Sequence, residues 1–280
     1  MIKKNNIREK VIKDFGLEWQ RFDQSDQFFK SDESKKIFDR YFDIFPFKEI
    51  NINSIGMDLG CGSGRWAKYI APKVKKLILV DPSKKALDIA KKKLYEFNNV
   101  VFYCNDIDLL PIENNSLDFT YSLGVLHHLS DTQKAIKNIS IKLKKNAPLL
   151  LYLYYSLDNR SFIYKFIWKT TNIMRIVISS LPVKLKNIVC DILALIIYFP
   201  LARLSLLLNL IKINYNFLPL SFYKDKSFYT MRTDCLDRFG TKLEKRFSLK
   251  EIKEMMEKAG FINIINSDKE PYWCVVGFKE

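Results

Sequence analysis

The alternation of short apolar runs with amphipathic segments between residues 52 and 155 constrains the fold more than any other feature. Apolar runs bounded by turn residues are typical of buried strands, and the segments between them carry apolar residues at helical spacing. Strands that alternate with helices of this length form βαβ units, which build a parallel sheet with helices on both faces. The alternation stops after residue 155 and resumes near residue 247. The predicted α/β fold has seven mostly parallel strands: SIGMD, KLILV, VVFYC, LDFTYSL, PLLLYLYY, FINIIN and YWCVVGF.

The segment MDLGCGSGRW, residues 57–66, places glycine at every second position directly after the first of these strands. Residues 62–67 fit the loose dinucleotide pattern GxGxxG/A, so the glycines alone do not identify the ligand. Asp58 does discriminate, because a carboxylate there repels a pyrophosphate on the following helix and attracts a cation. S-adenosylmethionine carries an ammonium and a sulfonium and no phosphate. Asp81 ends the next strand, where an acid accepts hydrogen bonds from ribose hydroxyls.

These motifs resemble those of the class I S-adenosylmethionine-dependent methyltransferases, across about residues 50–155 and again in RFSLKEIKEMMEKAGF. MDLGCGSG resembles the first motif of that family, VDPS the end of its second strand, NDIDLLPIENNSLDFTYS its adenine-contacting segment, and SLGVLHHLSD the segment after strand four. The resemblance implies a Rossmann-like fold, methyltransferase activity and S-adenosyl-L-methionine as cofactor. The cofactor-binding residues that it implies are Asp58, Gly60, Cys61, Gly62, Gly64, Asp81, Asp106, Ile107 and Ser122.

Within this set the resemblance assigns the ribose to Asp81 and the adenine rim to Asp106 with Ile107, with Asp108 as a competitor for Asp106. Cys61 is expected to be a small packed side chain and not a nucleophile. FGLEWQRF and PYWCVVGFK also resemble a branch of the type 11 methyltransferases that is associated with carbohydrate and cell-envelope biosynthesis.

His127 and His128, the only histidines, follow the fourth strand and so are expected near the methyl donor. An oxygen acceptor needs a base within hydrogen-bond reach, and one of the two is our hypothesis for that general base. The alternative is that one histidine packs beneath the next helix while the other is solvated. GVLHH lacks the carboxylates of metal-binding family members, so no metal is expected.

Residues 156–229 form an insert in the alternating pattern. Pro182, Pro200 and Pro219 divide it at intervals of 18 and 19 residues, and each proline suits a helix boundary. The first predicted helix, SFIYKFIWKTTNIMRIVISSL, is amphipathic, and the next two are far more apolar.

A membrane span is not expected in the insert, because its longest uncharged run, residues 192–202, has 11 residues and a span needs about 20. Two interpretations remain. The favoured one is a helical lid whose apolar faces are buried on one another and on the sheet edge. The other is a monotopic surface that holds the chain at an anionic bilayer near a lipid-linked acceptor.

A polar and aromatic segment, FYTMRTDCLDRFGTKLEKRF, follows the insert and is expected to be a loop that returns to the sheet. Its candidates for acceptor recognition compete with a second interpretation, an internal salt-bridged loop that anchors the lid. The candidates are Tyr229, Arg232, Asp234, Asp237 and Arg238.

The chain has 46 lysines and arginines against 31 acids, a formal charge of +15. No run mixes dense arginine with exposed aromatics, which favours basic solvated faces over a nucleic-acid groove. The five cysteines show no metal-ligand spacing and indicate a reducing compartment. The N-terminus carries no secretory signal pattern. We expect a cytoplasmic protein, with peripheral contact at the inner face of the membrane as an alternative.

The sequence therefore predicts N-terminal helices over residues 1–48, a Rossmann-like cofactor domain over 49–155, the insert over 156–230, and a helix with two strands over 231–280 that completes the core. The expected reaction is methyl transfer to a small-molecule or lipid-linked acceptor at oxygen. The alternatives are an RNA methyltransferase and a cofactor-binding protein without turnover.

Overall fold

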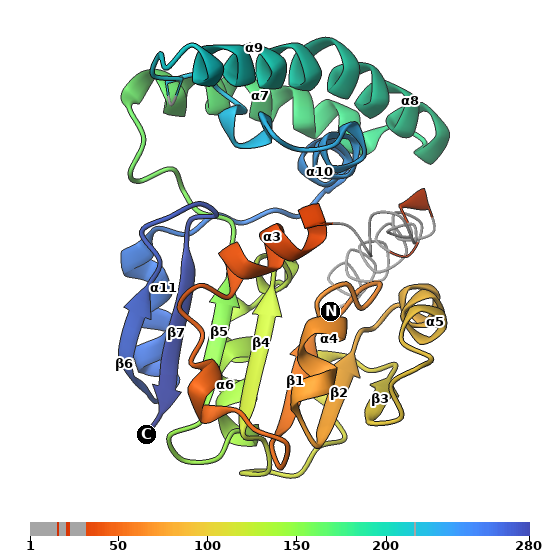
Figure 1. Cartoon of the computed structure of the whole chain (residues 1–280), viewed down its shortest axis with the longest axis vertical. Coiled ribbons are helices and arrows are strands. Elements are labelled where there is room, and N and C mark those ends of the chain that lie inside the picture. The colour runs from red at the N-terminus through yellow and green to blue at the C-terminus, as the bar shows by residue number, and fades with distance from the viewer. Residues whose placement is uncertain (1–15, 17–20, 23–31, 216) are drawn as a thin grey trace. The chain divides into compact units, whose positions relative to one another are not determined.

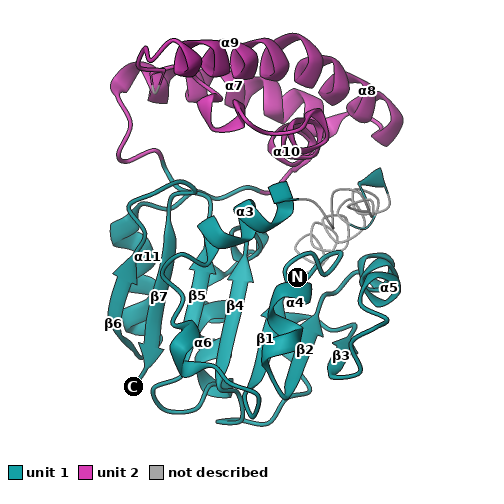
Figure 2. Cartoon of the chain, viewed as in Figure 1, with its two compact units in different colours: residues 1–156, 244–280 teal, residues 157–243 magenta. Residues whose placement is uncertain are grey.

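The computed structural model describes residues 16, 21–22, 32–215 and 217–280, and the chain divides into two compact units (Figure 2). Unit 1 contains residues 1–156 and 244–280, and unit 2 contains residues 157–243. The insert thus ends later than the residue 230 expected from the sequence. The predicted helix IREKVIKDF and most of FGLEWQRF lie outside the described residues.

Unit 1 is built on one seven-stranded sheet in the order β3-β2-β1-β4-β5-β7-β6 (Figure 1). Only β7 runs antiparallel to its neighbours, β5 and β6. The predicted α/β fold and every predicted strand are confirmed. The strands are β1 (Ile55–Leu59), β2 (Lys76–Val80), β3 (Val100–Tyr103), β4 (Phe119–Leu123), β5 (Pro148–Tyr152), β6 (Phe261–Asn266) and β7 (Cys274–Lys279).

Helices cover both faces of this sheet, as the βαβ pattern predicts, because strands such as β4 and β5 are buried on both sides. Three helices begin at capping side chains: Ser83 accepts from a backbone N–H of α5, Asp131 from one of α6, and Ser248 forms a capping box with Glu251 in α11. The α-helices with described bounds in unit 1 are α3 (Asp32–Tyr41), α4 (Ala67–Ile70), α5 (Lys84–Lys93), α6 (Thr132–Lys142) and α11 (Leu249–Lys258).

The strand order reverses between β1 and β4, which are neighbours in the sheet. From β1 the chain moves outward to β2 and β3, then returns to β4 on the other side. In open α/β sheets, crossovers that leave in opposite directions from two such strands form a ligand-binding crevice at their carboxyl ends, and we use the word crevice for this edge of the sheet. The glycine-rich loop after β1 and the histidine pair after β4 both lie at this edge.

Unit 2 is helical and contains α7 (Phe162–Ser180), α8 (Val183–Leu193), a π-helical turn (Ala194–Tyr198), α9 (Phe199–Leu210) and α10 (Phe228–Gly240). The predicted boundary at Pro182 is confirmed, but those at Pro200 and Pro219 are wrong. Residues 183–210 form one continuous helix through Pro200, and that helix ends well before Pro219. A proline removes one helical N–H and crowds the preceding turn, and the π turn directly before it accommodates that change.

The segment predicted as a recognition loop after the insert is also helical, since residues 228–240 form α10 with Ser227 as its N-cap. Its apolar residues recur at helical spacing, and the buried ones include Met231, Cys235 and Phe239. The many polar residues of the segment led to its prediction as a loop. The acceptor candidates Tyr229, Arg232, Asp234, Asp237 and Arg238 therefore lie on a helix of unit 2.

Candidate active site

The glycine-rich loop after β1 has a backbone that only glycine adopts without strain. Gly60, Gly62 and Gly64 have φ angles of 75°, 54° and 73°, in the left-handed region. A Cβ at Gly60 would lie 2.4 Å from a methyl group of Val125. The amide nitrogens of Gly60 and Cys61 donate to the carbonyl oxygen of Val80 at 2.7 and 3.2 Å. These bonds fix the loop to the end of β2, so that its backbone lies close to whatever occupies the crevice.

Asp81 follows β2 and is tied to the same loop. Its Oδ2 accepts from the amide of Gly62 at 3.0 Å, and its Oδ1 accepts from the amide of Ser83 at 2.8 Å. Burial raises the pKa of Asp81 to about 6, although the two backbone hydrogen bonds lower it. Each carboxylate oxygen keeps a further lone pair, which suits the ribose hydroxyls that the sequence predicts as its partners.

Asp58 is a buried carboxyl directly behind the loop, with 2% of its surface exposed. Its Oδ2 has no hydrogen-bond partner among the described residues. Burial raises the pKa of Asp58 to about 8, and the nearby charge of Asp81 adds to this effect. The Tyr121 hydroxyl attracts the carboxyl and lowers the pKa, but neither this hydroxyl nor Oδ2 reaches full hydrogen-bond geometry.

A buried carboxyl without a partner favours its protonated form, and it is ionised at low cost only when a cation compensates its charge. The crevice therefore suits a ligand with a positive group near Asp58 and vicinal hydroxyls near Asp81. S-adenosylmethionine has both, and a pyrophosphate would bring negative charge against both acids. The residues present fit this cofactor.

The predicted adenine rim lies at the 3₁₀ turn Ile107–Leu109 after β3. Asp106 caps this turn by accepting from the Asp108 amide at 3.3 Å, and Ile107 is buried with 8% exposed. The carboxylate of Asp108 forms an ion pair with Lys134 at 3.1 Å and accepts from Asn138 at 3.0 Å. Asp108 thus ties the turn to α6, and Asp106 remains the candidate for the adenine.

Two other predicted cofactor residues, Cys61 and Ser122, are buried, and contact of Cys61 with the cofactor stays a prediction. The thiol of Cys61 is buried, and burial first, then the charges of Asp81 and Asp58, raise its pKa well above the usual range. A thiol held in its neutral form is a poor nucleophile. Ser122 is fully buried and donates its hydroxyl to the carbonyl oxygen of Leu59 at 2.9 Å, joining β4 to β1. Direct contact between Ser122 and the cofactor stays a prediction.

The two histidines occupy the 3₁₀ turn Leu126–His128 after β4, and both are buried. The Tyr154 amide donates to Nδ1 of His127 at 3.4 Å, and the Tyr154 ring stacks on the same imidazole at a centroid distance of 3.8 Å. The pKa of His127 is lowered well below its usual value by burial first, then by the charges of His128 and Arg246. The expectation that one of the two is solvated is wrong, because both side chains are buried.

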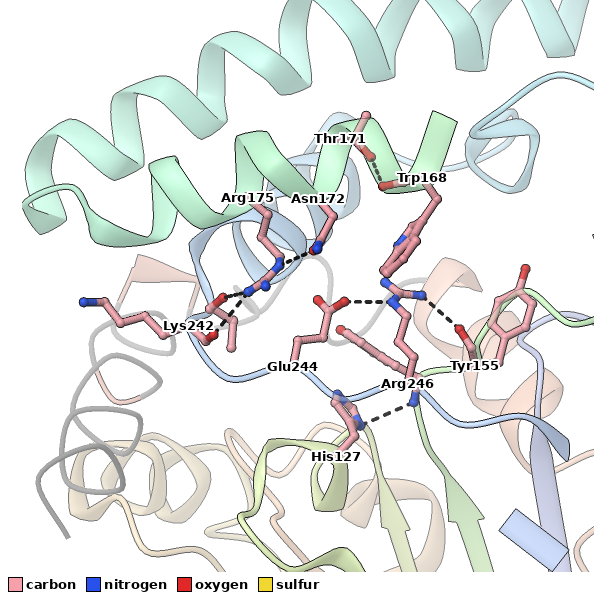
Figure 3. A network of polar contacts seen from close by, with 11 residues as sticks. His127, Tyr155, Trp168, Thr171, Asn172, Arg175, Lys242, Glu244 and Arg246 are labelled. Atoms are coloured by element: carbon pink, nitrogen blue, oxygen red, sulfur yellow. Dashed lines mark hydrogen bonds and ion pairs between the residues drawn. The ribbon is translucent and has the colours of Figure 1, made fainter. Parts of the chain in front are cut away.

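The chain that returns to the sheet, residues 244–247, is tied to His127 by a backbone hydrogen bond and carries Glu244 and Arg246, which the sequence prediction missed (Figure 3). Arg246 donates from Nε to Glu244 at 2.8 Å and from Nη1 to the Tyr155 carbonyl at 3.1 Å, and its guanidinium lies 5.3 Å from the Tyr154 ring centroid. The amide of Lys245 donates to the carbonyl of His127 at 3.2 Å. The sequence signal that could have identified these residues is the charged run directly before the capped helix α11.

The predicted acceptor residues on α10 have partners within unit 2. Arg232 forms a bidentate ion pair with Asp191, with both N–O distances at 2.9 Å. Asp234 accepts from the Tyr223 hydroxyl at 2.9 Å, and the Arg238 guanidinium lies 5.4 Å from the Trp168 ring centroid. These contacts fit the alternative interpretation, internal anchoring. A role in acceptor recognition stays a prediction for all five residues.

Over the parts of the chain that the structure describes, no group of three histidine, cysteine or acidic side chains could hold a metal ion.

This sheet order, with a glycine loop after β1 and an acid after β2, defines a class I S-adenosylmethionine-dependent methyltransferase domain. Residues 57–151 match the family model described as a methyltransferase domain. S-adenosyl-L-methionine is the cofactor of this class, in agreement with the charge of the site.

Curated relatives match the same segment. An uncharacterized methyltransferase of Bacillus subtilis, YcgJ, is 30% identical over 102 residues, which cover 36% of this chain and 40% of that protein. The ubiquinone biosynthesis O-methyltransferase of Coxiella burnetii is 29% identical over 107 residues, covering 38% and 44%. The chain thus matches less than half the length of these relatives.

A methyltransferase solved in complex with the Trm112 methyltransferase activator of Haloferax volcanii is similar in fold, with a TM-score of 0.53 at 13% identity. The alignment covers 94% of this chain and 96% of the other. At this identity the likeness shows the fold alone.

Proposed function

We propose that the whole chain is an enzyme that transfers the methyl group of S-adenosylmethionine to a hydroxyl oxygen of a small-molecule acceptor, free or lipid-linked. The observation that carries the cofactor half is the buried carboxyl of Asp58, whose Oδ2 is unpartnered among the described residues. The acceptor half is supported by the imidazole pair after β4 and by similarity to a relative named as an O-methyltransferase.

Bound S-adenosylmethionine supplies a methyl group on a positively charged sulfur, already activated for displacement. The chain's own task is to position and to exclude water, which is worth several kcal/mol when reactants are held in line. Asp58 holds the positive amino-acid part, the loop backbone packs against it, and Asp81 orients the ribose. Ile107 offers an apolar surface to the adenine.

The two histidines have different roles in this proposal. Nδ1 of His127 accepts from the Tyr154 amide, so the neutral ring carries its proton on Nε2. Nε2 of His127 has no partner among the described residues, which suits a donor that orients the acceptor oxygen. His128 is then the general base that takes the proton from the acceptor hydroxyl.

A transfer assay with a radiolabelled methyl donor tests the proposal against phenols, catechols, sugar nucleotides, lipid extracts and total RNA. We expect alkali-stable label on a hydroxyl compound. This label should be lost when His128 is replaced. H128A should lower kcat by about 100-fold or more and leave cofactor affinity unchanged, whereas H127A should raise KM more than it lowers kcat.

Calorimetry separates the cofactor half from the acceptor half. Binding of S-adenosylmethionine without label transfer to any acceptor would favour the cofactor-binding protein without turnover. Tight binding of NAD with no response to S-adenosylmethionine would overturn the proposal as a whole. Label found in RNA alone would replace the small-molecule acceptor with a nucleic acid.

A further inference from the structure

Helix α7 in unit 2 has its apolar side outward. Its exposed apolar residues recur at spacings of three and four and are 40–70% exposed: Ile163, Phe166, Ile167, Ile173, Met174 and Val177. The opposite side carries Trp168, Asn172 and Arg175, and Arg175 is only 8% exposed. A helix at the surface of a water-soluble domain shows the reverse pattern, with the apolar stripe facing the core.

The polar side of α7 makes the internal contacts. Arg175 donates from Nη1 to the carbonyl oxygens of Thr241 and Lys242 at 2.8 and 3.2 Å, and from Nε to Asn172 at 2.7 Å. Figure 3 shows the side chain of Arg175 directed at the chain that follows α10. Because this charge is buried and bonded, the orientation of α7 is fixed within unit 2.

The continuous helix formed by α8, the π turn and α9 repeats this arrangement. Its inward side combines Lys186, Ala194 and Ser205 with the larger residues Leu193 and Tyr198. Lys186 is 6% exposed and donates to the Gly240 carbonyl at 3.2 Å. Its outward side is aliphatic and aromatic and is 37–59% exposed: Leu185, Ile188, Ile192, Leu195, Ile196 and Phe199.

Both helices pack on α10, and α7, α8 and α9 lie together in unit 2 (Figure 2). We define the apolar face as the two sets of six outward residues of α7 and of α8–α9. Small and polar residues between helices with large apolar residues outside are typical of helices whose surroundings are lipid. Exposed apolar patches larger than a few hundred Å² mark interaction sites in soluble proteins.

Charge distinguishes the occupants of this face. The exposed charged side chains of α7, α8 and α9 are the lysines Lys165, Lys169 and Lys184. The one acid in these helices, Asp191, forms an ion pair with Arg232. In a two-fold dimer both copies would bring these lysines to the interface, and α7, α8 and α9 offer no exposed acid to pair with them. An anionic lipid surface accepts both the lysines and the apolar side chains.

The helix Val183–Leu210 is long and apolar enough to cross a membrane by length and composition. Spanning would place both its sides in hydrocarbon, including buried Lys186, the Asp191–Arg232 pair and Arg203, which donates to the carbonyls of Lys224 and Lys226. The side that packs within unit 2 carries these charged groups, so we expect the helix to lie in the interface with its outward apolar side immersed by about 5–10 Å.

We propose that the apolar face of unit 2 is a monotopic membrane-binding surface for anionic lipid. It involves none of the residues that hold the cofactor, so it stands whether or not the proposed reaction is correct.

Vesicle flotation of the full chain tests the proposal with phosphatidylcholine alone and with phosphatidylcholine and phosphatidylglycerol in equal parts. We expect association with the mixed vesicles, weakened by salt. Replacing Lys165, Lys169 and Lys184 by glutamine should lower the partition coefficient about fivefold for each lysine. I173Q/I192Q should abolish association with the vesicles at low salt and at high salt. The matched control I52Q/I265Q changes two exposed isoleucines of unit 1 and should float like the parent chain.

A fluorophore that reports polarity locates the surface. In a C104S background we place it on cysteine at position 173 or at position 137, an exposed lysine of α6 in unit 1. A blue shift on vesicle addition at 173 and none at 137 supports the proposal, and equal shifts overturn it.

Three results would contradict the membrane surface. They are no association with mixed vesicles at low salt, a concentration-dependent dimer that I173Q/I192Q disrupts, and a large fall in the melting temperature of I173Q/I192Q in the absence of lipid. The second result would identify the apolar face as an interface between two copies of the chain. The third would mean that protein already covers it.

Discussion

The two units bury charged side chains in opposite ways. In unit 1 the buried charges at the crevice are acids, and Oδ2 of Asp58 has no partner among the residues described. In unit 2 the buried charges of α7 and α8 are basic, and Arg175 and Lys186 donate to backbone carbonyls. An unsatisfied buried charge costs stability and suits a ligand, whereas a satisfied one stabilises the fold. Removing each kind of charge should therefore have opposite consequences.

The largest effect is expected from D58N. Breaking a buried charge pair by removing one partner costs about 3–5 kcal/mol, so the dissociation constant for S-adenosylmethionine should rise by at least about 100-fold. The ligand-free variant should be more stable than the parent at pH 8, because it no longer buries an ionised carboxyl. Calorimetry and thermal melts measure the two effects. Unchanged affinity, or a fall in stability, would remove Asp58 from the site and end the contrast.

R175M should lower the stability of the chain, whereas D58N should raise it. It leaves the carbonyls of Thr241 and Lys242 without their charged donor, at a cost of roughly 2–3 kcal/mol in the free energy of unfolding. Cofactor affinity should not change. Urea unfolding and proteolysis within residues 157–243 follow the effect. The matched control is K165M, which removes an exposed charge from the same helix and should be almost neutral. Equal losses for both variants would contradict a special role for the buried arginine.

The pH dependence of cofactor binding sharpens the contrast further. The pKa of Asp58 is raised to about 8, so the ligand-free fold prefers the protonated acid, and the ligand requires the carboxylate. Affinity should rise by up to about tenfold per pH unit between pH 6 and pH 8, with proton release on binding. The ammonium of the cofactor titrates equally with both chains, so the difference between parent and D58N isolates Asp58. Parallel curves for the two chains would refute the assignment.

The same shift fixes the sign of the stability change without ligand. A folded-state pKa above the unfolded value gives stability that is present below about pH 4 and lost as the pH rises towards 8. Melting temperatures of the ligand-free parent should fall relative to D58N over this window. A constant difference in melting temperature between the two chains from pH 4 to pH 8 would mean that Asp58 does not titrate in this range.

The sequence predicts unit 1 far better than unit 2, for a physical reason. The strands, the glycine loop and Asp81 are specified by local patterns, since a positive φ needs glycine and a buried strand needs an apolar run. Helical periodicity shows that α7 has two sides but not which one faces inward. The lid interpretation assigned the apolar sides to the interior, whereas residues such as Ile173 are exposed on unit 2; whether the insert is a lid stays a prediction.

The proton position on His127 was also beyond prediction, because it depends on the amide of Tyr154, 27 residues away. Periodicity likewise could not anticipate that a π turn before Pro200 would keep the helix continuous. In each case a contact or a backbone adjustment that the local pattern does not encode decides the outcome.

The smallest effect concerns the Asp191–Arg232 pair, which is about one-third exposed on both sides. A partly exposed ion pair contributes roughly 0.5–1 kcal/mol, even with two-pronged geometry. In a double-mutant cycle of D191N and R232Q, we expect a coupling of this size in the free energy of unfolding and no change in KM for the acceptor. A rise in KM for R232Q with no coupling in stability would instead assign Arg232 to acceptor recognition. Unit 2 would then carry a charge that serves a ligand, and the division between the two units would no longer hold.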